Sequence, residues 1–126
     1  MGYESRLYIV VKSDTNFNPE TNFLFAEVIA EFNMCKFPEL YSLFIKEGIK
    51  TNCAFYRGDD EITEDMYGEP LRELSVEKVI DGLNKIIASY GNKSFYWRLP
   101  PLLAMLEKFS ESQDIYHPLT VLHFGY

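Results

Sequence analysis

The spacing of hydrophobic residues at the two ends of the chain predicts two β-strands. Residues 7–11 form an unbroken β-branched and aromatic run, which is typical of a strand. The turn-forming residues 13–19 follow it and indicate a loop. Residues 119–124 have the same β-branched and apolar character. We expect this last strand to lie beside the first, closing the sheet with the two chain ends near each other.

Residues 23–34 fit two different periodicities. Apolar residues alternate with Glu27, Glu31 and Asn33, as in a half-buried strand. Apolar residues also recur at helical spacing through the same segment. We favour a long strand, because the alternation is broken only at Ile29, whereas a helix would spread large apolar side chains around its whole circumference.

Three stretches carry apolar residues on one helical face, and each has its own start or stop signal. The first begins at Pro38 and stops at Gly48, and the second follows Ser75, a good N-cap. The third follows Pro100 and Pro101, which either begin that helix or kink it. The expected helices cover residues 38–48, 76–88 and about 100–109, with a strand over residues 51–56 after the first.

Strands and helices in this uneven order predict an α+β fold. We expect residues 1–126 to form a single domain: a mostly antiparallel sheet of four to five strands, with about three helices packed on one face. A doubly wound parallel sheet is disfavoured, because it needs crossover helices and the first two strands are not separated by one.

Composition indicates a cytoplasmic chain. Hydrophobic residues make up 47% of it, yet no apolar run is long enough to cross a membrane, and the N-terminus lacks the features of a secretory signal. In that compartment Cys35 and Cys53 are expected to be free buried thiols rather than a disulfide. No cofactor motif is present.

Negative charge is concentrated in one short segment. The formal charge is −7 at pH 7, and seven of the nineteen acidic residues lie between positions 59 and 73, where Arg72 is the only basic residue. We expect a hairpin that turns at Tyr67-Gly68 and exits through Leu71 to Leu74. Its acidic residues are Asp59, Asp60, Glu61, Glu64, Asp65, Glu69 and Glu73.

This acidic segment has three interpretations. A calcium loop starting at Asp59 fits poorly, because Glu64 occupies the glycine position and Pro70 occupies the position of the last glutamate. A solvated hairpin whose like charges prevent sheet edges from associating is a second interpretation. The third is a binding surface that attracts a basic partner.

Other kinds of chemistry find little support. The chain has no basic cluster for direct nucleic-acid binding. Trp97 and its neighbours could stack on bases, but we favour the interpretation that these side chains pack under the third helix. Neither cysteine has a nucleophile motif, His117 precedes a proline in a loop, and His123 lies in an apolar strand that suits a core histidine. The sequence therefore predicts no catalytic and no metal-binding residue.

Two alternatives to a binding surface remain open. The first is a pocket for a small molecule or nucleotide, lined by aromatic side chains; the candidates are Tyr8, Tyr56, Tyr96 and Trp97. The second is a structural or homodimeric module, because the aromatic content exceeds what one small core absorbs.

Three segments carry a resemblance to a known group of proteins. Residues 2–10, 64–71 and 121–126 resemble small uncharacterised proteins of phages and prophages in low-GC Gram-positive bacteria. The resemblance implies action in the host cytoplasm by occupying the surface of a host protein. We therefore expect a non-catalytic binding protein, an inhibitor of a host nucleic-acid-handling or defence factor, that uses residues 59–73 against a basic protein surface.

Overall fold

The fold is α+β, with two β-sheets and three helices in the part of the chain that the structure describes. The computed structural model describes residues 4–12, 17–18, 23–65, 68–90, 96–114 and 118–125. The helices are α1 (Pro38–Glu47), α2 (Val76–Tyr90) and α3 (Leu99–Ser112). The strands are β1 (Ser5–Val11), β2 (Phe17–Asn18), β3 (Phe23–Phe25), β4 (Glu27–Cys35), β5 (Ile49–Lys50), β6 (Cys53–Arg57), β7 (Asp60–Ile62), β8 (Arg72–Leu74) and β9 (Leu119–Gly125).

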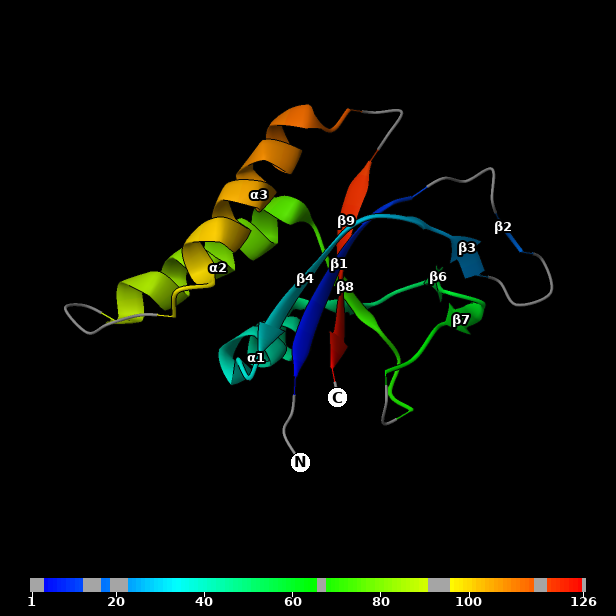
Figure 1. The fold of residues 1–126 in the computed structure, drawn as a ribbon, viewed down its shortest axis with the longest axis horizontal. Coiled ribbons are helices and arrows are strands. Elements are labelled where there is room, and N and C mark those ends of the chain that lie inside the picture. The colour runs from blue at the N-terminus through cyan, green and yellow to red at the C-terminus, as the bar shows by residue number, and fades with distance from the viewer. Residues whose placement is uncertain are drawn as a thin grey trace.

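The larger sheet is built around the first and last strands. Within the described residues its order is β4-β1-β9-β8-β5, and every neighbouring pair is antiparallel. Ser5 pairs with Gly125 and Val11 with Leu119, so β1 and β9 match along their full length (Figure 1). The predicted fold class and the predicted pairing of the terminal strands are confirmed.

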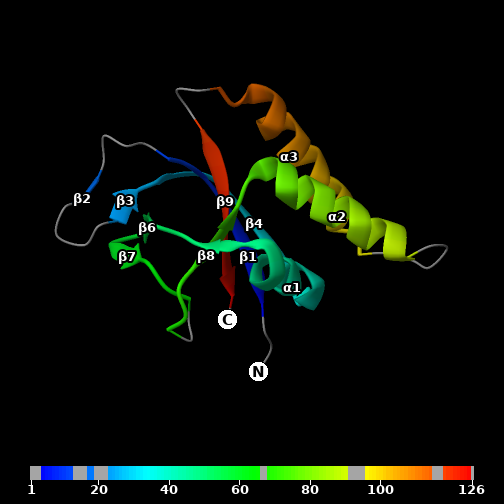
Figure 2. The same ribbon diagram turned by 180° about the vertical axis from the view of Figure 1, so that it is seen from behind.

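Alternate residues of β1 enter two different cores. Leu7 and Ile9 pack in the core beneath the helices, whereas Tyr8 and Val10 pack on the opposite face of the sheet. The two views of the ribbon show the helices on one side of the central strands and a smaller sheet on the other (Figures 1 and 2). The helices cover one face, as predicted, and the second sheet on the opposite face was not predicted.

The three helices begin where the sequence indicated. Pro38 and Leu99-Pro100 occupy first-turn positions of α1 and α3, so the prolines begin α3 rather than kinking it. The Ser75 hydroxyl accepts the Lys78 N–H at 3.2 Å, which is the N-cap bond predicted for α2. The buried side chains that the helices add to the core are Leu40, Phe44, Val76, Val79, Leu83, Leu99, Leu102 and Leu106.

The predicted strand over residues 23–34 is divided between the two sheets. It breaks at Ala26, whose N–H donates to the carbonyl of Ala54 at 2.8 Å. β3 pairs with β6 in the smaller sheet, whose order is β2-β3-β6-β7, and β4 becomes an edge of the larger sheet. The pairing of β4 with β1 is irregular at two points, which makes this exposed edge a poor template for another strand.

Gly48 sets the junction between α1 and β5. Its N–H donates to the Phe44 carbonyl at 2.9 Å, and a Cβ built on it would lie 2.4 Å from that same oxygen. Because the obstacle is backbone, the last turn of α1 must shift to accept any side chain. We expect Gly48→Ala to lower the free energy of unfolding by about 1–3 kcal/mol, measured by urea unfolding.

A second glycine provides the control for this substitution. Gly58 has a φ of +64° and open space around its Cα, and asparagine tolerates that backbone conformation. Gly58→Asn carries only the strain of this backbone conformation, so it should cost about 1 kcal/mol and less than Gly48→Ala. Equal losses in the two variants would contradict the proposed steric role of Gly48.

Candidate functional site

The acidic segment folds as two successive turns instead of the single predicted hairpin. The first turn, at Gly58, joins β6 to the short antiparallel strand β7. The second is closed by a bridge between Glu64 and Pro70, where the Asp65 carboxylate accepts the Glu69 N–H at 3.0 Å. Gly68, part of the predicted turn, has a φ of +79°; Tyr67 lies outside the described residues.

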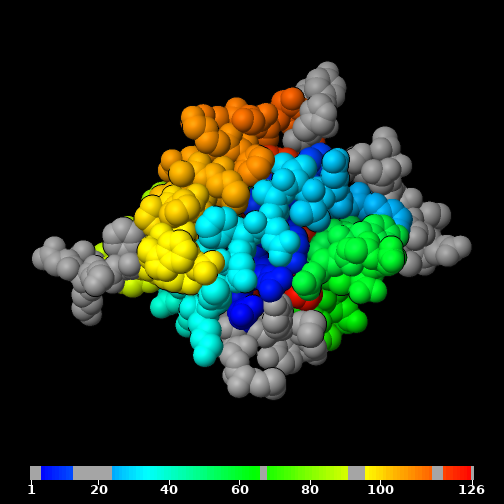
Figure 3. Space-filling view, in the orientation of Figure 1, coloured from blue at the N-terminus to red at the C-terminus, as the bar shows by residue number. Residues whose placement is uncertain are grey.

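Six of the seven predicted acidic residues gather on this double turn, which we call the acidic lobe: Asp59, Asp60, Glu61, Glu64, Asp65 and Glu69. All but Asp65, which is half-buried, are exposed, and these five form no ion pair within the described part of the chain. The lobe belongs to the green surface that projects at the lower right of Figure 3, away from the helices. Its charge is therefore presented to solvent.

The lobe carries charge on both faces of its β-ribbon. Asp60 lies opposite Arg57, whose guanidinium sits 5.6 Å from the centre of the Phe124 ring, on the face that meets the larger sheet. Glu61 lies opposite Tyr56 on the other face. The inner face therefore places a carboxylate opposite a basic residue, while the outer face combines a carboxylate with an exposed aromatic ring.

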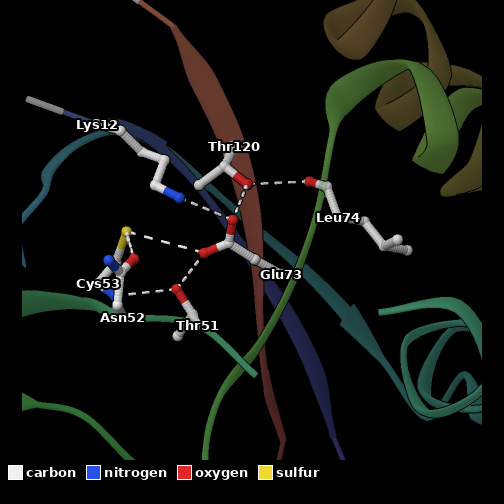
Figure 4. Close-up of polar contacts among 7 residues, drawn as sticks. All are labelled: Lys12, Thr51, Asn52, Cys53, Glu73, Leu74 and Thr120. Atoms are coloured by element: carbon white, nitrogen blue, oxygen red, sulfur yellow. Dashed lines mark hydrogen bonds and ion pairs between the residues drawn. The ribbon is translucent and has the colours of Figure 1, made fainter. Parts of the chain in front are cut away.

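Glu73 is separate from the acidic lobe. Its side chain is buried between the two sheets, where Lys12 Nζ lies 2.9 Å from Oε1 (Figure 4). Thr51 donates a short hydrogen bond to the other carboxylate oxygen, and the Thr120 hydroxyl lies 3.5 Å from Oε1. Because these contacts use Glu73 internally, it does not contribute to an exposed acidic surface.

Cys53 lies against the same carboxylate and is a structural thiol. Its Sγ is 4.0 Å from Glu73 Oε2, and its N–H donates to the Thr51 hydroxyl at 3.0 Å (Figure 4). Burial raises the pKa of the Cys53 thiol, which disfavours the reactive thiolate. Both cysteines are free, as predicted, although Cys35 is only half-buried.

The four aromatic residues predicted to line a pocket do not surround one space: the rings of Tyr96 and Trp97 are in contact, whereas Tyr8 and Tyr56 lie elsewhere. Tyr8 is buried between the sheets, with its ring centre 4.5 Å from that of Phe55. Tyr56 is exposed and stacks on Phe25. Tyr96 donates from its hydroxyl to the Met34 carbonyl at 2.7 Å, near the start of α3.

Trp97 does not pack under α3. It is 68% exposed, and the Arg98 guanidinium lies 4.7 Å from its ring centre. Arg98 also donates to the Asn33 carbonyl at 2.6 Å, which fixes the turn before α3. The prediction of a packed Trp97 is therefore wrong, because this turn directs the ring away from the core.

A cavity of about 210 Å³ lies between α1 and the end of the larger sheet. No pattern in the sequence indicates this cavity, because its walls come from five separate segments. The register places Lys50 opposite Arg72, and Arg72 opposite His123, so three basic side chains form a row across β5, β8 and β9. We call this space the basic-row cavity; its other lining residues are Tyr41, Phe44, Ile45, Asp65, Glu69 and Pro70.

His123 closes the inner end of this row. Its ring contacts those of Phe44 and Tyr41, with centres 5.2 and 5.8 Å away, and its Nε2 is 3.0 Å from the Ser5 hydroxyl. Burial lowers its pKa from the ordinary 6.5 to about 4. Ser5 is fully buried, so the pair is structural and not a nucleophile with its base. The prediction of a core histidine is confirmed, and His117 lies outside the described residues.

Comparisons with protein-family models, with curated proteins and with solved structures found no match for this chain. No helix in the described residues combines the length and the apolar character needed to cross a membrane. Among those same residues, no three His, Cys, Asp or Glu side chains come together in a way that could hold a metal ion.

The Lys12–Glu73 pair generates a stability prediction. Lys12→Met leaves a buried carboxylate without its counter-ion, so we expect the free energy of unfolding to fall by about 2 kcal/mol. This is below the 3–5 kcal/mol typical of fully buried pairs, because Lys12 is partly exposed. Adding Glu73→Gln to Lys12→Met should recover most of the loss, measured by urea unfolding. Additive losses in the double variant would contradict coupling between the two side chains.

His123 generates a prediction about pH. The unfolded chain protonates this histidine near pH 6.5 and the folded protein only near pH 4, so stability is lost as the pH falls through that range. Between pH 7 and 4.5 the free energy of unfolding of the wild type should fall by about 2 kcal/mol more than that of His123→Gln. Chemical unfolding at both pH values tests this, and parallel losses in the two proteins would contradict it.

Proposed function

We propose that this protein is a non-catalytic binding protein whose acidic lobe docks against a basic surface of another protein. The observation that carries the proposal is the set of five exposed carboxylates that protrude together and form no ion pair within the described residues. Like charges held close together favour a partner that neutralises them. They also create a local potential that accelerates encounter with a cationic surface.

The lobe has an aromatic contact as well as charge. Tyr56 is 54% exposed, and its ring stacks on Phe25 with centres 5.5 Å apart. A tyrosine held by stacking loses little conformational freedom on binding, which is why such rings are enriched at protein interfaces. Tyr56 therefore offers an apolar anchor beside Glu61, its opposite residue on β7.

Charge complementarity favours a different protein over a second copy at this surface. Two copies meeting lobe to lobe would bring like carboxylates together, which opposes association. The resemblance to phage and prophage proteins suggests a host partner in the cytoplasm, and a nucleic-acid-handling or defence protein has the basic surface that the lobe requires. In that setting the protein would act as an inhibitor by covering the partner's nucleic-acid site.

Charge reversal tests the docking surface. We expect Asp59→Lys, Glu61→Lys and Glu64→Lys together to weaken partner binding at least roughly tenfold, because three attractive charges become repulsive. Asp60 is left unchanged because a lysine there would lie directly opposite Arg57. Asp65 and Glu69 are left intact because they close the second turn and line the cavity. The partner is captured from a low-GC Gram-positive lysate, purified, and its affinity measured by calorimetry at low and high salt.

A matched variant controls for total charge. Glu39→Lys, Asp81→Lys and Glu107→Lys change the same number of exposed carboxylates on the three helices. This control should keep the wild-type affinity, and wild-type binding should weaken as salt rises. Equal effects of the two triple variants, or binding that does not respond to salt, would refute the acidic lobe as the docking surface.

A further inference from the structure

Two basic side chains, Lys50 and Arg72, meet at the wall of the basic-row cavity. Lys50 and Arg72 are directly opposite on neighbouring strands, so their side chains share one face of the sheet. Like charges in that position destabilise a sheet. Neither side chain forms an ion pair within the part of the chain that is described, and Arg72 donates only to the Gly48 carbonyl, at 3.2 Å. An anionic group between them would turn the repulsion into attraction.

Carboxylates reach the same cavity from a different element. Asp65 and Glu69, at the two ends of the second turn of the acidic lobe, both line it. Their charge disfavours a multiply charged anion such as phosphate. It favours a ligand that also carries a positive group, because an ammonium is a strong donor to carboxylates. Two cations and two carboxylates around one small space are complementary to a zwitterion.

Apart from His123, the other described lining residues are aromatic or aliphatic, and they define the rest of the ligand. Phe44 is buried, whereas Tyr41 and Ile45 are 41% and 46% exposed, large values for such side chains. Together with Pro70 they give the cavity an apolar side. A volume of about 210 Å³ is below the 300–1,000 Å³ range of pockets for drug-sized ligands. The space therefore suits a molecule with one short apolar group.

We propose that the basic-row cavity binds a free α-amino acid with an apolar side chain. Its carboxylate lies between Lys50 and Arg72, its ammonium faces Asp65 and Glu69, and its side chain contacts Tyr41, Phe44 and Ile45. The floor beneath it is His123, which contributes a polar ring without a positive charge at neutral pH. Ligand binding at this site does not require the partner proposed for the acidic lobe, although Asp65 and Glu69 belong to both.

Calorimetry and thermal unfolding with defined probes test the proposal. The probes are L-leucine, L-methionine and L-phenylalanine at up to about 10 mM, since a ligand with so few atoms binds weakly. Isovalerate, which lacks the ammonium, isoamylamine, which lacks the carboxylate, and inorganic phosphate complete the set. At least one amino acid should bind and raise Tm, and removing either charged group from the ligand should weaken binding at least roughly tenfold.

Paired variants locate the site. Lys50→Gln and Glu69→Gln should each weaken amino-acid binding at least roughly tenfold. Lys46→Gln and Glu47→Gln make the same chemical changes at exposed neighbouring positions outside the cavity lining, and should bind like the wild type. The triple reversal of Asp59, Glu61 and Glu64 should also bind the amino acid normally, so loss of the docking partner and loss of the ligand are separable.

Several results would overturn the proposal. One is the absence of binding by all three amino acids, and another is isovalerate or phosphate binding as tightly as the best of them. A third is an equal effect of Lys46→Gln and Lys50→Gln, which would show that the ligand responds to overall charge and not to this cavity.

Discussion

The pairing of β1 with β9 is the constraint on which the rest of the structure depends. These strands occupy the centre of the larger sheet and are covered on both faces, by the helices on one side and the smaller sheet on the other. Their alternate side chains therefore supply two cores at once. The pairing joins residues more than one hundred positions apart, and such non-local contacts are formed against a large loop-closure entropy.

The same sheet divides the acidic residues into two environments. Glu73, on β8, faces the space between the sheets and is satisfied by Lys12, Thr51 and Thr120. The carboxylates only a few positions earlier project from a short ribbon beyond that core. Glu73 therefore helps to hold the two sheets together, whereas five of the earlier carboxylates remain exposed to solvent.

The acidic lobe and the basic-row cavity are neighbours that share residues. Asp65 and Glu69 close a turn of the lobe and also line the cavity. The cavity arises where α1 ends at Gly48 and the chain returns as β5 beside β8, so its basic row depends on the register of two very short strands. A small change in that register would separate Lys50 from Arg72.

The sequence alone determined the elements with strong local signals. Helices α1, α2 and α3 follow from apolar spacing together with Pro38, Ser75 and the prolines at 100 and 101, and the terminal strands follow from β-branched runs, because these signals act between residues close in the chain. It also located the acidic segment. Tertiary structure alone decided that the strand over residues 23–34 breaks at Ala26, that Glu73 is buried, that Trp97 is exposed, and that Lys50, Arg72 and His123 form a row. These outcomes depend on which strands become neighbours and in what register. Burial and pairing between residues far apart in the chain decide both, so local periodicity does not predict them.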